Sequence, residues 1–405
     1  MQKRKRSVLC VLNFAMAALM VLLCASLAWA GPRERTLYTF AGGSNGDVPS
    51  GTLIFDSNGN LYGLSGGGAN GAGAIFQLTP SGSGSWTESV IYSFLNYSDY
   101  PGESIVFDLN GNLYGTMPSS GTCGAVYQLV PSTSGSWTQN IVFSFTDSAT
   151  QGCYPDTIIF DPATGNLYGI TEQGGANNGG VAFALAPVLG GGWNFNLIYS
   201  FCGAGCSPTG TLTLDSSGSL YGTTTAGGSY SDGTVFRLTN GTNGWTATTL
   251  YNFTGGYNGY STFGGVVFDQ HGNIYGVTDE PGGGDDVGNV IELTPTKGDW
   301  IIHVIHTFTG GPDGGNPAAY KLAIDRPGNL YGTTTLGGLY GYGTAYKLAP
   351  SSNGKWTETV LHSFTNGADG ANPDCGFVFD SAGNLYGSTN NGGADGYGVV
   401  FEVKP

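Results

Sequence analysis

The chain has 405 residues, a formal net charge of −15 at pH 7, 72 glycines and 13% aromatic residues. Its acidic balance argues against nucleic acid and anionic lipid as partners, because both repel a negatively charged surface. Its aromatic content is too high for a disordered chain, so we expect a folded protein.

At the N-terminus, residues 1–30 have the three parts of a Sec-type signal peptide. Residues 3–6 are basic, an apolar run starts at Val8, and residues 28–30, Ala-Trp-Ala, form a small-residue cleavage site. The apolar run is also long enough to span a bilayer, so its retention as an N-terminal anchor stays open. We expect a mature chain that is secreted to the extracellular space or the periplasm and has no further membrane span. Four of the 13 basic residues lie in the signal peptide, which leaves 9 against 28 acidic ones and a net charge of −19.

A repeated motif organises the mature chain. It first occurs at residues 56–63 as Asp-Ser-Asn-Gly-Asn-Leu-Tyr-Gly, and its tyrosine recurs at Tyr62, Tyr114, Tyr168, Tyr221, Tyr275, Tyr331 and Tyr386. Units of this size cannot bury a core alone, so the period indicates a stacked or radial repeat. The Asp-x-x-Gly-Asn part predicts a hairpin, in which Asp bonds the backbone and Gly supplies the positive φ. Seven carboxylates in register also suggest calcium, but we favour hairpin chemistry.

Each repeat divides into four short runs typical of strands. In the first unit these are residues 52–55, 60–64, 74–78 and 86–94, which we name runs a, b, c and d. No helical periodicity occurs in the mature chain. Run d opens on Trp and closes on Phe eight residues later, and this even spacing predicts both rings on one face of the strand, packed between neighbouring sheets.

The ends of the chain predict how the sheets close. The last unit stops at Pro405, at the end of run c, and has no run d. Residues 32–40 match the run d frame, with Phe40 eight residues after Pro32. We therefore predict an all-β, seven-bladed β-propeller with four-stranded blades, in one domain of residues 31–405. Residues 36–40 are expected to close the ring as the outermost strand of the blade that holds Tyr386.

The repeats resemble known repeat families. The order Gly-Asn-Leu-Tyr-Gly-Thr-Thr-x-Gly-Gly followed by Gly-Thr-Val-Phe-x-Leu is clearest in residues 218–238 and 328–348, and it is similar to the GloVer tandem repeat of exported bacterial proteins. This resemblance covers nearly all of the mature chain. The order of Tyr, Gly-Gly, aromatic residue and Trp also resembles the kelch repeat. The GloVer resemblance implies an exported repeat protein and supplies no catalytic residues.

The irregular loops between runs d and a and between runs b and c are expected on one face of the ring. They carry tyrosines, aspartates and asparagines, which suit stacking on sugar rings and hydrogen bonding to hydroxyl groups. The candidate ligand-binding residues are Asp47, Asp99, Tyr100, Tyr154, Asp156, Tyr230, Tyr257, Tyr260, Asp313, Tyr320, Tyr342, Asp369, Asp374 and Tyr397.

From these loops we predict a binding or surface-interaction module that recognises a glycan or an extracellular or cell-surface protein. We expect a monomer that requires no cofactor. One alternative is a carbohydrate-active hydrolase or lyase that uses loop carboxylates. Another is a structural or adhesive protein without a small ligand, in which these residues are ordinary turn residues.

One loop between runs b and c is rich in acidic residues. Asp279, Glu280, Asp285 and Asp286 flank three glycines, and carboxylates on such a loop suit Ca²⁺. A solvated acidic loop without metal is the alternative.

The mature chain contains five cysteines, and disulfides are expected in an exported protein. Cys123 and Cys153 fall in neighbouring loops of the same expected face, and Cys202 and Cys206 flank a short loop. We predict these two pairs as disulfides. Cys375 is left either free or intermolecular.

Overall fold

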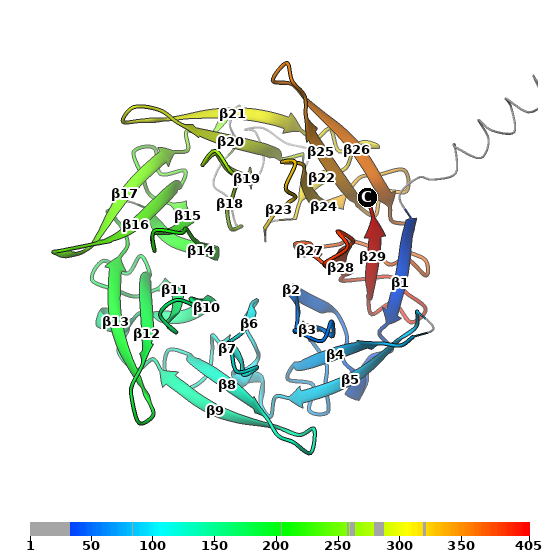
Figure 1. Cartoon of the computed structure of the whole chain (residues 1–405), viewed down its shortest axis with the longest axis horizontal. Coiled ribbons are helices and arrows are strands. Elements are labelled where there is room, and N and C mark those ends of the chain that lie inside the picture. Colours follow the sequence, from blue (N-terminus) through cyan, green and yellow to red (C-terminus); the bar gives the residue numbers. More distant parts are fainter. Residues whose placement is uncertain are drawn as a thin grey trace, which may run out of the picture.

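The structure is a computed structural model that describes residues 33–82, 84–203, 205–256, 259, 264–278, 287–318 and 321–405. Its strands form seven antiparallel sheets arranged as blades around a central axis (Figure 1). The chain is thus the all-β, seven-bladed propeller that the sequence predicts. The predicted signal peptide lies outside the described residues, so its cleavage stays a prediction.

The first four blades follow the chain order, with the innermost strand first. Blade 1 has β2 (Pro49–Phe55), β3 (Leu61–Ser65), β4 (Ala74–Pro80) and β5 (Trp86–Ser93), and blade 2 has β6 (Ile105–Phe107), β7 (Leu113–Met117), β8 (Ala125–Pro131) and β9 (Trp137–Ser144). Blade 3 has β10 (Cys153–Phe160), β11 (Leu167–Gln173), β12 (Val181–Pro187) and β13 (Trp193–Ser200), and blade 4 has β14 (Cys206–Leu214), β15 (Leu220–Ala226), β16 (Thr234–Gly241) and β17 (Gly244–Asn252).

The remaining blades show two variations. Blade 5 has β18 (Val267–Phe268), β19 (Ile274–Thr278), β20 (Asn289–Pro295) and β21 (Trp300–Thr307). In blade 6 two short inner strands, β22 (Gly315–Pro317) and β23 (Ala323–Ile324), both pair with β24 (Leu330–Leu336), followed by β25 (Thr344–Pro350) and β26 (Trp356–Ser363). Blade 7 has β27 (Val378–Phe379), β28 (Leu385–Thr389) and β29 (Val399–Lys404). Short helical turns η1 (Gly43–Asn45), η2 (Tyr97–Asp99) and α2 (Ser148–Gln151) lie in loops.

The fourth strand of blade 7 comes from the N-terminal side of the described chain, as predicted. β1 (Arg33–Thr39) pairs antiparallel with β29 and forms the outer edge of that sheet (Figure 1). The backbone N–H of Phe40 continues the pairing by donating to Gly398 O at 3.1 Å. An ion pair of 2.9 Å joins Arg35 on β1 to the buried Glu402 on β29. The ring is therefore closed by two segments far apart in sequence.

The Asp-x-x-Gly-Asn motif forms the predicted hairpin between the two inner strands. In blade 2, Asp108 Oδ1 accepts the backbone N–H groups of Asn110 and Asn112 at 2.8 and 2.9 Å. Its Oδ2 accepts Asn112 Nδ2 at 2.8 Å and the Tyr114 hydroxyl at 3.1 Å. Gly111 has a φ of 81°, which glycine adopts without strain. Both oxygens of the Asp108 carboxylate therefore accept hydrogen bonds within its own turn, which favours a structural role for this aspartate over calcium binding.

We expect Asp108→Ala to lower the free energy of unfolding by about 2 kcal/mol. The substitution removes hydrogen bonds to a charged acceptor, and the Tyr114 hydroxyl loses the carboxylate to which it donates. Asp108→Asn keeps one oxygen for the two backbone donors and should cost less. Urea unfolding of the three proteins measures the difference. Millimolar Ca²⁺ should leave the unfolding midpoint of the wild type unchanged, and a rise that Asp108→Ala abolishes would show that the turn binds metal.

The Trp and Phe of run d lie on opposite faces of the blade, so the prediction of a shared face is wrong. Trp86 packs on Tyr386 of blade 7 with ring centroids 6.0 Å apart. Phe94 of the same blade packs on Tyr127 of blade 2 at 5.3 Å. Both rings nevertheless lie between neighbouring blades, where buried clusters of this kind form the core.

A β-bulge in run d explains why the two rings point apart. Tyr92 pairs with Ile75 across the sheet, whereas Val90 pairs with Phe76, so Ile91 is an extra residue. One extra residue reverses the alternation of side chains beyond it. The same register shift occurs in the outer strand pair of every blade.

Both predicted disulfides are present, Cys123–Cys153 and Cys202–Cys206. The first joins the loop after β7 to the start of β10, and so ties blade 2 to blade 3. Cys375 is a free, buried thiol whose Sγ accepts the Ser388 N–H at 2.9 Å, and burial raises its pKa to about 11. Its burial excludes the intermolecular disulfide that the sequence left open.

Candidate functional site

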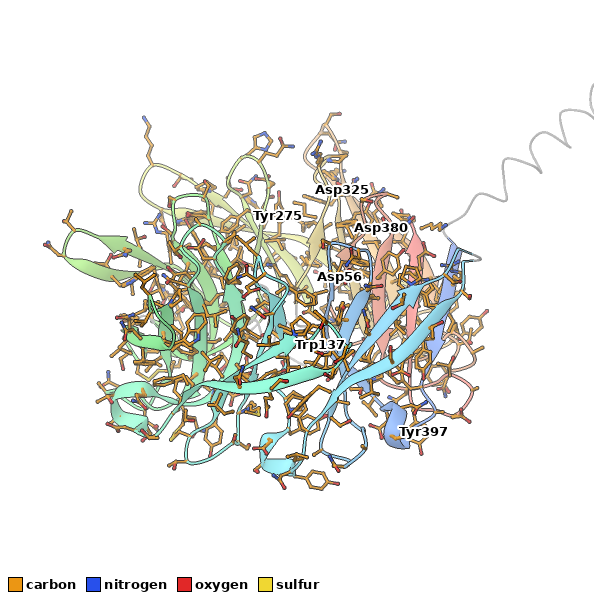
Figure 2. All side chains as sticks on the ribbon, turned by 60° about the horizontal axis from the view of Figure 1, so that its bottom comes forward. Asp56, Trp137, Tyr275, Asp325, Asp380 and Tyr397 are labelled. Carbon is orange, nitrogen blue, oxygen red and sulfur yellow. A yellow bond between two sulfur atoms is a disulfide. The ribbon has the colours of Figure 1, made fainter. Side chains whose placement is uncertain are left out.

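The loops between runs d and a and between runs b and c lie together on one face of the ring, as predicted. The backbone N–H of Gly66, in a b–c loop, donates to Asp47 O in the adjoining d–a loop at 2.6 Å, and Gly338 N donates to Gly311 O at 2.8 Å. We call this the loop face, and the opposite face, with the a–b and c–d turns, the turn face. Figure 2 shows Tyr397 on the loop face and Asp56, Asp325 and Asp380 on the turn face.

Exposed tyrosines gather on the loop face. Seven tyrosines of the described residues are between 38% and 76% exposed: Tyr97, Tyr100, Tyr154, Tyr230, Tyr340, Tyr342 and Tyr397. Six of them lie in d–a or b–c loops, and Tyr154 is the second residue of β10, directly after a d–a loop. The repeated tyrosines of run b are in contrast buried. The predicted Tyr257, Tyr260 and Tyr320 lie outside the described residues.

Three of the candidate aspartates hold their own loops in shape. Asp313 accepts the Thr309 N–H at 3.0 Å and the Thr309 hydroxyl, and Asp369 makes the same two contacts with Thr365. Asp369 Oδ2 also lies 2.9 Å from Nε2 of His362. Asp99 accepts the Ser120 hydroxyl at 2.9 Å and so links a d–a loop to a b–c loop. These carboxylates are engaged in turn hydrogen bonds, which makes them supports for the loop face.

Asp47 and Tyr100 come from successive d–a loops and face each other across Gly66. A Cβ at Gly66 would lie 2.6 Å from Asp47 Oδ1 and 3.4 Å from the Tyr100 hydroxyl, so this glycine permits the approach. Burial and the Asp47 carboxylate raise the pKa of Tyr100, which keeps its hydroxyl protonated and able to donate.

An acidic group lies at the loop-face end of the inner strands of blades 2 and 3. Asp156, in β10, is buried, and its pKa is raised to about 8 by burial and by the charges of Glu103 and Glu172. Glu172 lies near the end of β11, and burial raises its pKa as well. Gly102 lets the two blades meet here, because a Cβ at that position would lie 2.8 Å from Asp156 O. The raised pKa favours the protonated form of Asp156 at neutral pH, next to the carboxyl groups of Glu103 and Glu172.

Asp374 begins the inner segment of blade 7 and is not brought into this group. Burial raises its pKa to about 6, and a hydrogen bond with Asn390 partly offsets the effect. The candidate acids are thus divided between separate blades.

Among the described residues, no cluster of three or more His, Cys, Asp or Glu side chains has the arrangement of a metal site. The predicted calcium loop with Asp279, Glu280, Asp285 and Asp286 lies outside the described residues, so calcium binding there stays a prediction. Nor does any helix within the described part of the chain have the length and apolar character needed to cross a membrane.

Comparison with known families identifies the repeats. The model of the Gloeobacter/Verrucomicrobia repeat matches residues 26–216, 100–323 and 207–405 in three overlapping segments. The chain belongs to this family. No curated protein sequence matches it. Membership of the Gloeobacter/Verrucomicrobia repeat family agrees with the resemblance found in the sequence.

Solved structures that resemble this Gloeobacter/Verrucomicrobia repeat protein share its fold. A Lactobacillus plantarum protein is 14% identical, with a TM-score of 0.52 over 85% of this chain and 89% of that one. The periplasmic gluconolactonase PpgL of Pseudomonas aeruginosa is also 14% identical, with a TM-score of 0.52 over 77% and 84% of the two chains. An oxidoreductase (glucose dehydrogenase) of Thermus thermophilus is 16% identical over 92% and 100%, but its TM-score of 0.42 carries no weight. The first two similarities support the propeller fold alone.

Three residues of the loop face were missed in the sequence. Tyr97 follows the same run d as the predicted Tyr100, so inspection of the whole loop could have found it. Glu103 precedes its turn aspartate, Asp108, by five residues, as Asp156 precedes Asp161. Alignment of the repeats on the turn aspartate could therefore have placed Glu103 beside Asp156. No such signal identifies Glu172, because the position of its side chain depends on how far β11 extends.

Proposed function

We propose that this Gloeobacter/Verrucomicrobia repeat protein is an exported binding module whose loop face recognises a glycan. The observation that carries the proposal is the gathering of the exposed tyrosines on this face. A tyrosine ring offers an apolar surface for the face of a sugar, and its hydroxyl can both donate and accept hydrogen bonds. The seven tyrosines come from several blades, which suits an extended chain better than a single small molecule.

Export is supported by the two disulfides, because disulfides persist in oxidising compartments. The mature chain meets its ligand in the extracellular space or the periplasm in this proposal. The acidic composition favours a neutral glycan over an anionic one, since like charges repel. An extracellular protein ligand is the other outcome of the test below.

We expect the double variant Tyr230→Ala, Tyr342→Ala to bind its glycan about tenfold more weakly, because each aromatic contact contributes roughly 0.5–1.5 kcal/mol. A glycan array, run with and without Ca²⁺, finds the ligand, and calorimetry compares the two proteins. Leu189→Ala is the matched control, because it removes an exposed apolar side chain from a c–d turn of the turn face. If the wild type binds no glycan on the array, the proposal is overturned in favour of a protein ligand or an adhesive role.

A second candidate function rests on the raised pKa of Asp156. Glycoside hydrolysis uses a protonated acid together with a second carboxyl group, one as general acid and the other as base or nucleophile. In this alternative Asp156 donates a proton to the leaving oxygen, and Glu172 or Glu103 provides the carboxylate. Comparison of the wild type with Asp156→Asn, in both glycan hydrolysis and stability, tests this function.

A further inference from the structure

The turn face carries two pockets at equivalent positions in the ring, far from the loop face. One lies between blades 1 and 2 and has a volume of about 460 Å³. The other lies between blades 5 and 6 and has a volume of about 330 Å³. Both volumes fall within the usual range of small-ligand sites, roughly 300–1,000 Å³. Figure 2 shows Asp56, Tyr275 and Asp325, which line these pockets, on the face opposite Tyr397.

The two pockets are made of the same parts of the repeat. Each has a turn aspartate, the tyrosine of run b, the proline that ends run c and the tryptophan that opens run d. In the first pocket these are Asp56, Tyr62, Pro131 and Trp137, and in the second they are Asp269, Tyr275, Pro350 and Trp356. Since the matching residues come from successive blades in the same way, we call the pockets interblade grooves.

Each groove has an aromatic wall. The rings of Tyr62 and Trp137 lie edge to face with centroids 6.3 Å apart, and those of Tyr275 and Trp356 lie 5.7 Å apart. Both tryptophans are half-buried, so part of each indole remains accessible from the groove. The tyrosine hydroxyls are already bound to the turn aspartates, at 3.2 Å in both grooves. Since Tyr62 and Tyr275 are themselves buried, the accessible surface of the wall is mainly the apolar ring surface of the two tryptophans.

The rim of each groove is polar. Ser57 and Asn58 are exposed on the turn that borders the first groove, and His271 holds the position of Asn58 in the second. Such side chains can bond to hydroxyl groups at the edge of a ring that lies on the aromatic wall.

Apart from the turn aspartates, the charged residues near the grooves differ between them. The second groove has Glu292 and Arg326, whereas the matching positions in blades 1 and 2 are Gln77 and Leu109. The turn aspartates are common to both grooves, but Asp56 and Asp269 already accept hydrogen bonds within their own turns. A ligand that fits both grooves must therefore depend mainly on the aromatic wall and the polar rim. A neutral sugar ring meets this requirement.

The second groove continues outward along the blade. A neighbouring pocket of about 540 Å³ shares Glu292, Gly354 and Trp356 with it and reaches His303 and Lys355 on the outer strands and turn. Trp356 therefore lines two adjoining pockets, which together offer room for more than one linked ring.

We propose that the interblade grooves bind a neutral polysaccharide, with one sugar ring against the tryptophan of each occupied groove. These grooves are separate from the loop face, so this binding activity is additional to the function proposed for the loop face. Six of the seven blades carry the tryptophan, at Trp86, Trp137, Trp193, Trp245, Trp300 and Trp356, so in this proposal the same aromatic contact is available at six positions around the ring. Repeated weak sites favour a repetitive ligand, because linked binding events raise the overall affinity by roughly 10²–10⁴-fold.

The test is an NMR titration of the ¹⁵N-labelled mature chain with cellohexaose, maltohexaose and chitohexaose. The six indole N–H signals are assigned with single Trp→Phe variants. We expect at least one hexasaccharide to shift the signals of both Trp137 and Trp356. If none of the three sugars shifts either signal, or if only one groove responds to every sugar, the proposal is overturned.

A blocking variant shows whether the sugar occupies the groove. Ser57→Arg places a long side chain at the exposed rim of the first groove, and we expect it to abolish the shift of Trp137 and to leave that of Trp356. Ser216→Arg is the matched control, because Ser216 holds the equivalent turn position in blade 4. It should leave the Trp137 signal responsive. A Trp137 shift that survives Ser57→Arg would contradict the proposal.

The loop face is tested separately in the same titration. The variant Tyr230→Ala, Tyr342→Ala should leave the shifts of Trp137 and Trp356 unchanged, because its tyrosines lie on the other face. Loss of both shifts in that variant would assign the hexasaccharide to the loop face and overturn the groove proposal.

Discussion

Replacing Asp156 with asparagine is expected to stabilise the protein by up to about 5 kcal/mol at pH 9 and by little at pH 4. In the folded state the pKa of Asp156 is raised from 3.8 to about 8 by burial and by Glu103 and Glu172. Between about pH 4 and pH 8 the folded chain therefore holds a proton that the unfolded chain releases. The free energy of unfolding falls as pH rises through this window, by up to about 1.4 kcal/mol per pH unit for one group. Asparagine has no proton to lose.

Urea unfolding of the wild type and of Asp156→Asn, at one-unit steps from pH 4 to pH 9, measures this effect. The difference between the two proteins isolates Asp156 from other titrating groups. Glu103→Gln is the matched second variant, since removing that charge should lower the pKa of Asp156 and move the window to lower pH. A difference between wild type and Asp156→Asn that stays constant with pH would contradict the expected ionisation.

The same variant separates the two candidate functions. If the protein hydrolyses glycans with Asp156 as general acid, Asp156→Asn should lose the activity and keep the binding. If the protein is a binding module, no hydrolysis is expected in either protein, and binding at the tyrosines should persist. Reducing-sugar release from the glycans that the array identifies provides the measurement.

Deleting residues 31–40 is expected to unfold the ring or open it at 25 °C. The deletion removes β1, the side chain of Phe40, which is fully buried, and the Arg35 partner of buried Glu402. Loss of a buried phenylalanine alone costs about 3–5 kcal/mol, and small domains are stable by roughly 5–15 kcal/mol. The edge of β29 would also become available for pairing with other chains.

Thermal unfolding and size-exclusion chromatography compare residues 31–405 with residues 41–405. We expect loss of the cooperative transition, or association, in the shorter chain. A synthetic peptide of residues 31–40 should restore part of the stability if the strand acts by pairing with β29. A midpoint within a few degrees of that of residues 31–405 would show that β1 does not hold the ring closed.

Much of the fold follows from regular features of the sequence. The turn aspartates and tyrosines recur in every unit, and the hydrogen bonds of Asp108 show why the pattern is local: the carboxylate, its backbone donors and Tyr114 lie within seven residues. The N-terminal segment has an additional run d, and the last repeat has none. This difference predicted the pairing of β1 with β29. The bulge in run d escaped prediction, because the even spacing of Trp and Phe predicts unbroken alternation. An aliphatic residue nevertheless holds the extra position in every blade, such as Ile91 in blade 1 and Val142 in blade 2.

The candidate site was less accessible to prediction. The composition of the loops predicted the tyrosines, but the sequence did not distinguish exposed side chains from those engaged in their own turns, such as Asp313 and Asp369. The interblade grooves were missed for another reason. Their parts were identified as hairpin and core residues, and each groove is completed by the neighbouring blade.

The sequence by itself determined the number of blades, the hairpins, the closure of the ring and the two disulfides, because each depends on local turn chemistry or on counting equivalent strands. The tertiary structure decided which groups meet across blades. It placed Glu103 and Glu172 beside Asp156, and Trp137 beside Tyr62. The physical reason is that burial and electrostatic coupling depend on the distance between side chains of different blades, which the repeat period does not specify.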